Sequence, residues 1–125
     1  MSQLPWLDHT LNFPSPHSAL KDPDGLLAAG GDLSIERIVA AYRAGIFPWF
    51  SDDQPILWWS PNPRCVIHPE QAYTSKSLRK HIRTSSLTLS FDTQFEMVIR
   101  HCARLNSEEG TWITPEMEEA YIQLH

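Results

Sequence analysis

The sequence lacks the features that would place the chain in a membrane or outside the cell. No apolar run approaches the roughly 20 residues that a bilayer-spanning helix needs. The N-terminal stretch MSQLPWLDHTLNFP has neither the basic start nor the apolar core of a secretory signal. Only two cysteines occur, Cys65 and Cys102, which is too few for a disulfide framework. We therefore expect free thiols, no membrane association and a cytoplasmic location.

Motifs for metals, nucleotides and nucleophilic catalysis are also scarce. There is no G-x-G-x-x-G or G-x-x-x-x-G-K-[ST] pattern, so Gly30-Gly31 predicts a tight turn rather than a phosphate site. Cys65 and His68 are predicted on a strand, where a separation of three points them to opposite faces, and Cys102 is predicted buried on the apolar face of a helix. No Ser-His-Asp or Cys-His arrangement is visible. We expect no metal, no cofactor and no catalytic residue in this chain.

Four segments carry helix signals. Residues 35–44 follow Ser34, a good N-cap, and end at Gly45, which adopts the left-handed conformation without a Cβ penalty. The remaining three begin at similar cap residues. They are expected at 76–84 after Ser75, from about 95 after the capping box of Thr93 and Glu96, and from Pro115 after Thr114.

Two segments read as strands, RCVIHP at 64–69 and the alternating SLTLSFD at 86–92. Together with the helices they predict an α+β fold, which suits 42% apolar and 20% charged residues. The last predicted helix reaches His125 without a stop signal. The second half of the chain, with two predicted strands and three predicted helices, also has too little to close a sheet sandwich well. We therefore expect the chain to be the N-terminal part of something longer.

The stretch GIFPWFSDDQPILWWSPNPR, residues 45–64, concentrates aromatic side chains on a proline-restricted backbone. It could form packed core, a peptide-binding groove or a platform for a flat ligand. Trp58 and Trp59 are adjacent on a probable extended segment, so one can pack inward while the other faces a groove. Packing is predicted for Phe47, Phe50 and Trp58. A ligand-facing role is predicted for Trp49, and for Trp112 on a loop beside Gly110.

The predicted helix at 76–84 is basic on one face. Lys76, Arg79, Lys80 and Arg83 fall at i, i+3, i+4 and i+7 with no acid among them, while Leu78 and Ile82 are expected to face the core. A solvated surface helix is one interpretation. The other is an anionic partner such as a phosphate backbone, because four like charges in two turns otherwise repel one another.

Five motifs together identify a family resemblance that runs from about Leu11 to His125. The motifs are NFPSP, GLLAAGGDLS, AYRAGIFPWF, PILWWSPNPR and EEGTWIT. In this combination the chain resembles the bacterial leucyl/phenylalanyl-tRNA–protein transferases. Members take Leu or Phe, sometimes Met, from aminoacyl-tRNA and attach it to proteins with an N-terminal Lys or Arg. The attached residue marks the acceptor for degradation through the N-degron pathway.

The resemblance implies a small N-terminal α+β domain at 1–62, followed from 63 to 125 by the beginning of a larger acetyltransferase-like (GNAT-type) mixed-sheet domain, apparently truncated. It assigns two tryptophans and two tyrosines to the aminoacyl-adenosine end of the tRNA and the basic helix to the tRNA body. These residues are Tyr42, Trp49, Trp112 and Tyr121 for the adenosine end, and Lys76, Arg79, Lys80 and Arg83 for the tRNA. The family's catalytic Asp and Gln match no residue here, so the chain alone is expected to be inactive.

Two rival functions stay open on the residues themselves. A non-enzymatic module could use the Trp/Pro surface to bind proline-rich or extended peptides. A plain RNA-binding domain could use the basic helix and the aromatic rings without catalysing anything.

Overall fold

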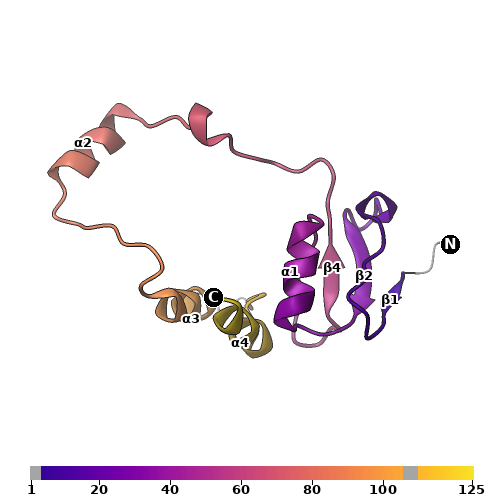
Figure 1. Cartoon of the computed structure of the whole chain (residues 1–125). Coiled ribbons are helices and arrows are strands. Elements are labelled where there is room, and N and C mark those ends of the chain that lie inside the picture. Colours follow the sequence, from indigo (N-terminus) through magenta and orange to yellow (C-terminus); the bar gives the residue numbers. More distant parts are fainter. Residues whose placement is uncertain (1–3, 106–109) are drawn as a thin grey trace. The chain divides into compact units, whose positions relative to one another are not determined.

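The computed structural model describes residues 4–105 and 110–125. The chain divides into two compact units, which are considered separately below. One comprises Met1–Asn62 with Gln94–His125, and the other is Pro63–Thr93 (Figure 1). The secondary structure is α+β, with four α-helices and one mixed four-stranded sheet in the described part of the chain. None of the described helices is long and apolar enough to cross a bilayer.

The sheet of the first unit has the strand order β1-β2-β4-β3. Strand β1 (Trp6–Leu7) runs parallel to β2 (Leu26–Gly30), and β2 is antiparallel to β4 (Leu57–Trp59). Strand β3 (Phe47–Pro48) pairs with β4 in the register Phe47 opposite Trp59 and Pro48 opposite Trp58. This register places Phe47 and Trp59 on one face of the sheet, and Pro48 and Trp58 on the other.

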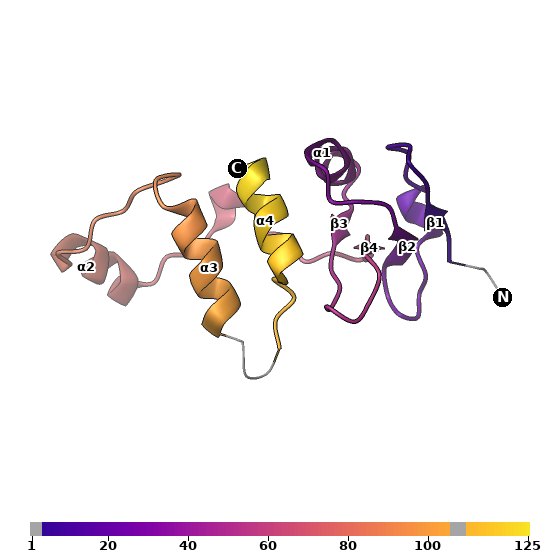
Figure 2. The same cartoon turned by 90° about the horizontal axis from the view of Figure 1, so that it is seen from below.

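Helix α1 (Ile35–Arg43) lies over the Trp58 face of the sheet (Figure 2). Ser34 caps it, because its hydroxyl accepts a hydrogen bond from the backbone N–H of Arg37 at 3.4 Å. Gly45 follows the helix with a φ of 73°, as the predicted left-handed residue. The predicted helix at 35–44 is therefore confirmed.

Trp58 is the largest side chain of the core that α1 and the sheet enclose. Its ring is fully buried, packs edge-on against Phe13 at 4.9 Å between centroids, and donates from Nε1 to the Gly30 carbonyl at 2.9 Å. Phe50 is also buried, as predicted. Phe47 is not: it is only partly buried, because the register with Trp59 turns it to the opposite face.

A buried arginine ties the sheet to the N-terminal segment. Arg37 is fully buried, and its Nη2 donates to the Asp8 carbonyl at 2.9 Å and to Asp32 Oδ2 at 3.1 Å. Hydrogen bonds from Ser34 and Arg37 lower the pKa of Asp32 to about 2, so the carboxylate is charged throughout the physiological range. Gly30 and Gly31 beside it have φ values of 80° and 77°, left-handed conformations that glycine adopts without a Cβ penalty.

Helices α3 (Phe95–Leu105) and α4 (Pro115–Leu124) complete the first unit. Thr114 caps α4 by accepting from the Met117 N–H at 3.2 Å, as predicted, and Met117 is fully buried. Arg100 on α3 donates to Glu118 on α4 at 3.0 Å. Cys102, predicted to be buried, is exposed because it lies on the solvent side of α3.

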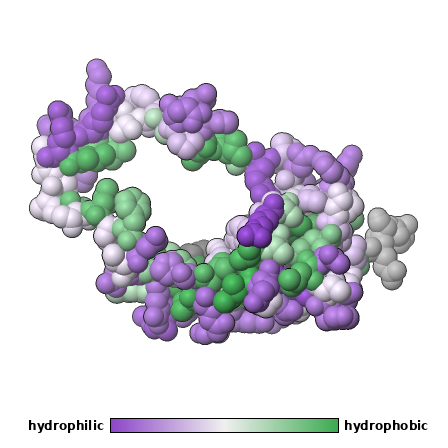
Figure 3. Space-filling view, in the orientation of Figure 1, coloured by the Kyte–Doolittle hydropathy of each residue, from purple (hydrophilic) through white to green (hydrophobic). Residues whose placement is uncertain are grey.

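The second unit, Pro63–Thr93, holds a 3₁₀ turn, η2 (Pro69–Gln71), and helix α2 (Lys76–Thr84). Ser75 caps α2 by accepting from the Leu78 N–H at 3.1 Å, so the predicted helix is confirmed. The predicted inward orientation of Leu78 and Ile82 is wrong, since both are exposed. Figure 3 shows hydrophobic surface next to the hydrophilic surface of α2.

The two predicted strands, at 64–69 and 86–92, are also wrong. Neither segment forms a strand in the structure, and Leu87, Leu89 and Phe91 are 79–89% exposed. A strand is defined by hydrogen bonds to a neighbour, and alternation alone supplies none. Within the described part of this unit there is no strand for either segment to pair with.

Candidate functional site

Two tryptophans from distant parts of the sequence meet in the first unit. Trp49 follows strand β3, and Trp112 lies in the loop before α4. Their ring centroids are 6.1 Å apart with the planes tilted by 48°. Both rings stay accessible, at 54% and 42% exposure. The structure thus brings together the two tryptophans that the sequence singles out.

Two tyrosines join the same two regions. The hydroxyl groups of Tyr42 on α1 and Tyr121 on α4 lie 2.6 Å apart, and the rings meet edge-on at 6.4 Å between centroids. Burial, and then the hydrogen bond to Tyr42, raises the pKa of Tyr121 well above its usual range. Tyr121 is therefore neutral at physiological pH, and either hydroxyl can be the donor in the bond between the two tyrosines.

Each member of the tryptophan pair is anchored by its neighbours. The Trp49 N–H donates to the Leu57 carbonyl at 2.9 Å, and the Trp49 carbonyl accepts from Trp59 Nε1 at 2.6 Å. On the other side, Ile113 is buried and its N–H donates to the Thr111 hydroxyl at 3.1 Å. The backbone is therefore fixed on both sides of the pair, which reduces the entropy lost when a ligand binds.

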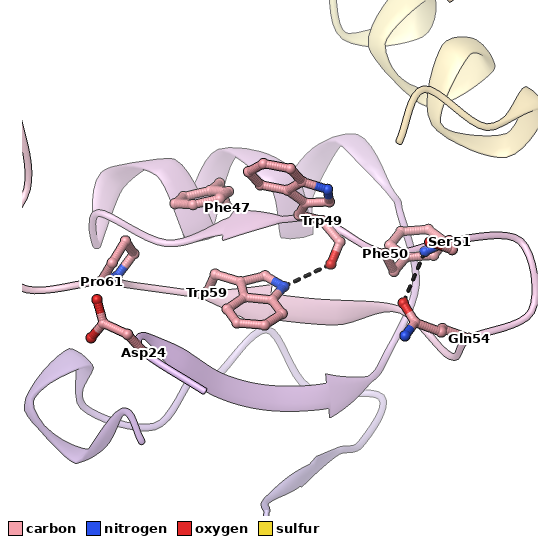
Figure 4. Close-up of a pocket in the computed structure, with 8 residues that line it drawn as sticks. All are labelled: Asp24, Phe47, Trp49, Phe50, Ser51, Gln54, Trp59 and Pro61. Atoms are coloured by element: carbon pink, nitrogen blue, oxygen red, sulfur yellow. Dashed lines mark hydrogen bonds between the residues drawn. The ribbon is translucent and has the colours of Figure 1, made fainter. Parts of the chain in front are cut away.

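A pocket of about 400 Å³ opens next to Trp49 on the exposed face of the β3–β4 hairpin (Figure 4). Its walls are aromatic, and its polar groups are few. The lining residues are Asp24, Phe47, Trp49, Phe50, Ser51, Gln54, Trp59 and Pro61. The volume lies in the range of roughly 300–1,000 Å³ that small-ligand pockets occupy.

The second unit carries a separate basic surface on α2. All four basic side chains of the predicted face are exposed, and within this unit none forms an ion pair with a described residue. A shallow depression of about 520 Å³ lies among Lys76, Arg79, Ile82 and Arg83. The structure confirms the predicted helix and the exposure of its basic side chains.

Comparisons with known proteins match both parts of the chain to one family. A family model described as leucyl/phenylalanyl-tRNA protein transferase N-terminal domain matches residues 31–62. A second, described as leucyl/phenylalanyl-tRNA protein transferase, matches residues 66–125. The chain belongs to this family. The resemblance inferred from the aromatic motifs is therefore confirmed.

Several curated relatives bear the name leucyl/phenylalanyl-tRNA–protein transferase. One from Hahella chejuensis is 56% identical over the whole chain, which covers 54% of that relative. Relatives from Pseudomonas fluorescens and Saccharophagus degradans are 52% and 50% identical over 98% and 100% of the chain, covering 55% and 52% of their own lengths. The chain spans about half the length of these family members.

The family motif EEGTWIT is only partly described, because Glu108 and Glu109 lie outside the described residues. The part that is described places Trp112 against Trp49, a juxtaposition that the resemblance predicts. The sequence reasoning did not assign a function to Trp59. Its partner across the hairpin, Phe47, shares its face, and that face becomes visible only once the β3–β4 register is known.

Residues that could hold a metal do not gather in the described ranges. No group of three or more His, Cys, Asp or Glu side chains there is arranged to bind an ion. Cys65, which the sequence places three residues before His68, is an exposed free thiol.

Proposed function

We propose that this chain forms part of an aminoacyltransferase, and that it holds the aminoacylated 3′ end of a tRNA. The reaction would move Leu or Phe, or sometimes Met, from the tRNA to the N-terminal Lys or Arg of an acceptor protein. The acceptor would then enter the N-degron pathway in the cytoplasm. The observation that carries the proposal is the meeting of Trp49 with Trp112 and of Tyr42 with Tyr121 in a member of this family.

The rings suit the adenosine end of a charged tRNA. A nucleobase stacked on an accessible indole gains roughly 1–3 kcal/mol, and Trp49 and Trp112 are both accessible. In the hydrogen-bonded tyrosine pair one hydroxyl donates to the other, and the remaining hydroxyl proton can be donated to a ribose or ester oxygen without adding charge. We assign Tyr42, Trp49, Trp112 and Tyr121 to binding and orientation of the aminoacyl-adenosine, not to bond making.

For this reaction the four residues need only orient the aminoacyl ester toward the acceptor amine. An aminoacyl ester is already activated, and an α-amine with a pKa of about 7.7–8.0 is partly neutral near pH 7. Holding ester and amine together supplies most of the acceleration in such a reaction. A carboxylate in the remaining part of the enzyme would take the surplus proton. Residues 63–125 would begin the GNAT-type catalytic domain, and this chain alone would be inactive.

Binding of an aminoacyl-adenosine analogue tests the assignment. A stable 3′-amide of phenylalanyl-adenosine should bind the chain, and Trp49→Ala or Trp112→Ala should weaken it about tenfold, the equivalent of one lost stacking contact. Trp6→Ala is the matched control, because Trp6 is 69% exposed and belongs to neither aromatic pair. Equal affinity in wild type, Trp49→Ala and Trp112→Ala would refute the assignment.

The basic helix gives a second, independent arm. If α2 contacts tRNA phosphates, Arg79→Gln with Arg83→Gln should lower the affinity for tRNA. The slope of the logarithm of the binding constant against the logarithm of the salt concentration should become shallower by up to about 0.9 per lost contact. Lys21→Gln with Arg104→Gln removes the same charge elsewhere and should leave the slope unchanged. An identical slope in both double variants would mean that α2 does not contact tRNA phosphates and is an ordinary solvated surface helix.

The rival peptide-binding module has one observation in its favour, the proline-framed aromatic pocket. It is tested by the same titrations. A proline-rich peptide that binds in the absence of RNA, with no binding of the adenosine analogue or of tRNA, would favour that module.

A further inference from the structure

The open face of the β3–β4 hairpin carries more aromatic surface than the adenosine end requires. Phe47 and Trp59 face each other across the hairpin, and Trp49, two residues after Phe47, lines the same pocket. The opposite face belongs to the core through Trp58, and all three of these rings line the pocket on this side. Figure 4 shows Trp59 facing the same open space as Phe47 and Trp49.

The tryptophan pair itself leaves no room for a base between its rings. A sandwiched base needs about 7 Å between parallel planes, two contacts of roughly 3.5 Å. Trp49 and Trp112 stand 6.1 Å apart at a tilt of 48°, so they touch each other. A base that contacts this pair must lie against it. Trp49 also borders the pocket, so the pocket continues the surface on which the adenosine end would rest.

The polar groups of the pocket favour a nucleobase over a phosphate. Its one charged lining residue is Asp24, a carboxylate that repels phosphate and accepts from an exocyclic amine. Gln54 lies at the other end (Figure 4). Its Oε1 already accepts from the Ser51 N–H at 3.0 Å, so its amide NH₂ is the group left to donate to a ligand. Aromatic walls with a carboxylate acceptor at one end match a base that carries an exocyclic amine.

We propose that this pocket binds the cytosine of the nucleotide that precedes the terminal adenosine of the tRNA, stacked on Trp59. The inference rests on the proposed function, because it extends the same RNA 3′ end by one nucleotide. The end of a tRNA is single-stranded, and its unstacked bases are free to stack on aromatic side chains. The hydrogen bond from Trp59 Nε1 to the Trp49 carbonyl holds the Trp59 ring in place before the ligand arrives.

Two probes isolate this pocket from the adenosine site. One is the 3′-phenylalanylamide of adenosine, and the other carries an added 5′ cytidylyl group. The chain should bind the dinucleotide about tenfold more tightly, the gain of one stacked base. Trp59→Ala should abolish this gain, so that the two probes bind that variant with equal affinity, whatever it loses for both through the missing hydrogen bond to the Trp49 carbonyl. Replacing cytidylyl with uridylyl should reduce the gain, and Asp24→Asn should remove that discrimination.

A further variant separates stacking from positioning of Trp49. Trp59→Phe keeps an aromatic face and loses the hydrogen bond to the Trp49 carbonyl. It should retain most of the dinucleotide gain if stacking is the function of Trp59. A Trp59→Phe variant that loses the dinucleotide gain would instead make Trp59 a support for Trp49 and overturn the proposal.

The remaining outcomes are equally decisive. Equal affinity of wild type for both probes overturns the cytosine pocket and leaves the adenosine site intact. Failure of wild type to bind either probe overturns the proposed function and the pocket with it. Binding of a proline-rich decapeptide that Trp59→Ala abolishes, without any cytidylyl gain, assigns the pocket to a peptide.

Discussion

The adjacent tryptophans Trp58 and Trp59 should respond in opposite ways to truncation. Trp58 is fully buried, touches Phe13, and gives its indole N–H to the Gly30 carbonyl. Trp58→Ala removes that ring and leaves the carbonyl without its donor. Truncation of a buried aromatic costs about 3–5 kcal/mol, so we expect a loss of about 4 kcal/mol. Small domains have only about 5–15 kcal/mol of stability, so this variant should be close to unfolding at room temperature.

Trp59→Ala is the matched comparison. It removes the same side chain from the next position, where the ring is partly exposed and its hydrogen bond reaches the accessible Trp49 carbonyl. We expect a loss of about 1 kcal/mol or less. Urea denaturation followed by far-ultraviolet circular dichroism gives both free energies of unfolding.

A milder variant keeps this prediction measurable even if Trp58→Ala does not fold. Trp58→Phe preserves most of the apolar ring and loses the hydrogen bond, so it should cost about 1–2 kcal/mol. Equal destabilisation by Trp58→Ala and Trp59→Ala would refute the reasoning, because it would mean that the two faces of the hairpin are equally buried.

Three further predictions follow from particular contacts. A double-mutant cycle with Tyr42→Phe and Tyr121→Phe should give a coupling of about 0.5–1.5 kcal/mol in the free energy of unfolding, the net contribution of one hydrogen bond. Folding lowers the pKa of the Asp32 carboxyl from 3.8 to about 2, so the carboxylate should stabilise the fold by about 1 kcal/mol above pH 4. This stabilisation should be lost as the pH falls toward 2. Acid denaturation of Asp32→Asn and wild type, compared side by side, measures it. Gly25→Ala should cost about 3 kcal/mol or more of unfolding free energy, because its Cβ would lie 2.5 Å from Pro61 Cα. Gly45→Ala should cost about 1–2 kcal/mol from left-handed strain alone, because nothing lies within 4 Å of its Cβ. Thermal denaturation compares the two variants.

Each of these predictions has a result that contradicts it. Strictly additive tyrosine variants would mean that the hydroxyl groups do not bond in solution. A stability difference for Asp32→Asn that stays constant between pH 5 and about pH 2 would contradict the lowered pKa. Equal losses for the two glycine variants would mean that the backbone near Pro61 yields to an added methyl group.

The helices were predictable because their signals are local. Ser34, Ser75 and Thr114 each cap a helix through a hydrogen bond that spans three residues. Such hydrogen bonds depend on the neighbouring sequence and not on the tertiary fold. Gly45 was equally readable, since only its own backbone has to adopt the left-handed conformation.

The strands were less predictable because a strand depends on a partner that the local sequence does not specify. SLTLSFD alternates as a strand should, yet residues 86–92 form none in the structure. In contrast, β3 is two residues long and contains a proline, and it pairs because β4 lies beside it. Alternation of apolar and polar residues shows which face a strand could bury, but the strand forms only where a neighbouring strand is present to pair with it.

The candidate site falls between these two cases. The resemblance named Trp49 and Trp112, but neither spacing nor periodicity relates two positions more than sixty residues apart. Their contact depends on α4 packing against α1, which buries Met117 and joins Tyr42 to Tyr121. For Trp59 the sequence allows a ring that faces a groove but assigns it no function. It sits beside a core tryptophan, and only the register of a two-residue strand reveals that it shares a face with Phe47.

The hairpin therefore divides its aromatic residues by face. The side that carries Pro48 and Trp58 supports the fold, and the side that carries Phe47 and Trp59 is left open. A ligand-binding ring must be accessible and yet fixed, and an exposed aromatic on an unsupported loop satisfies only the first condition. Here the buried face fixes the backbone from which the open face projects. Substitutions on the Trp58 face should thus impair binding only through lost stability, whereas substitutions on the Trp59 face should impair binding in a protein that remains folded.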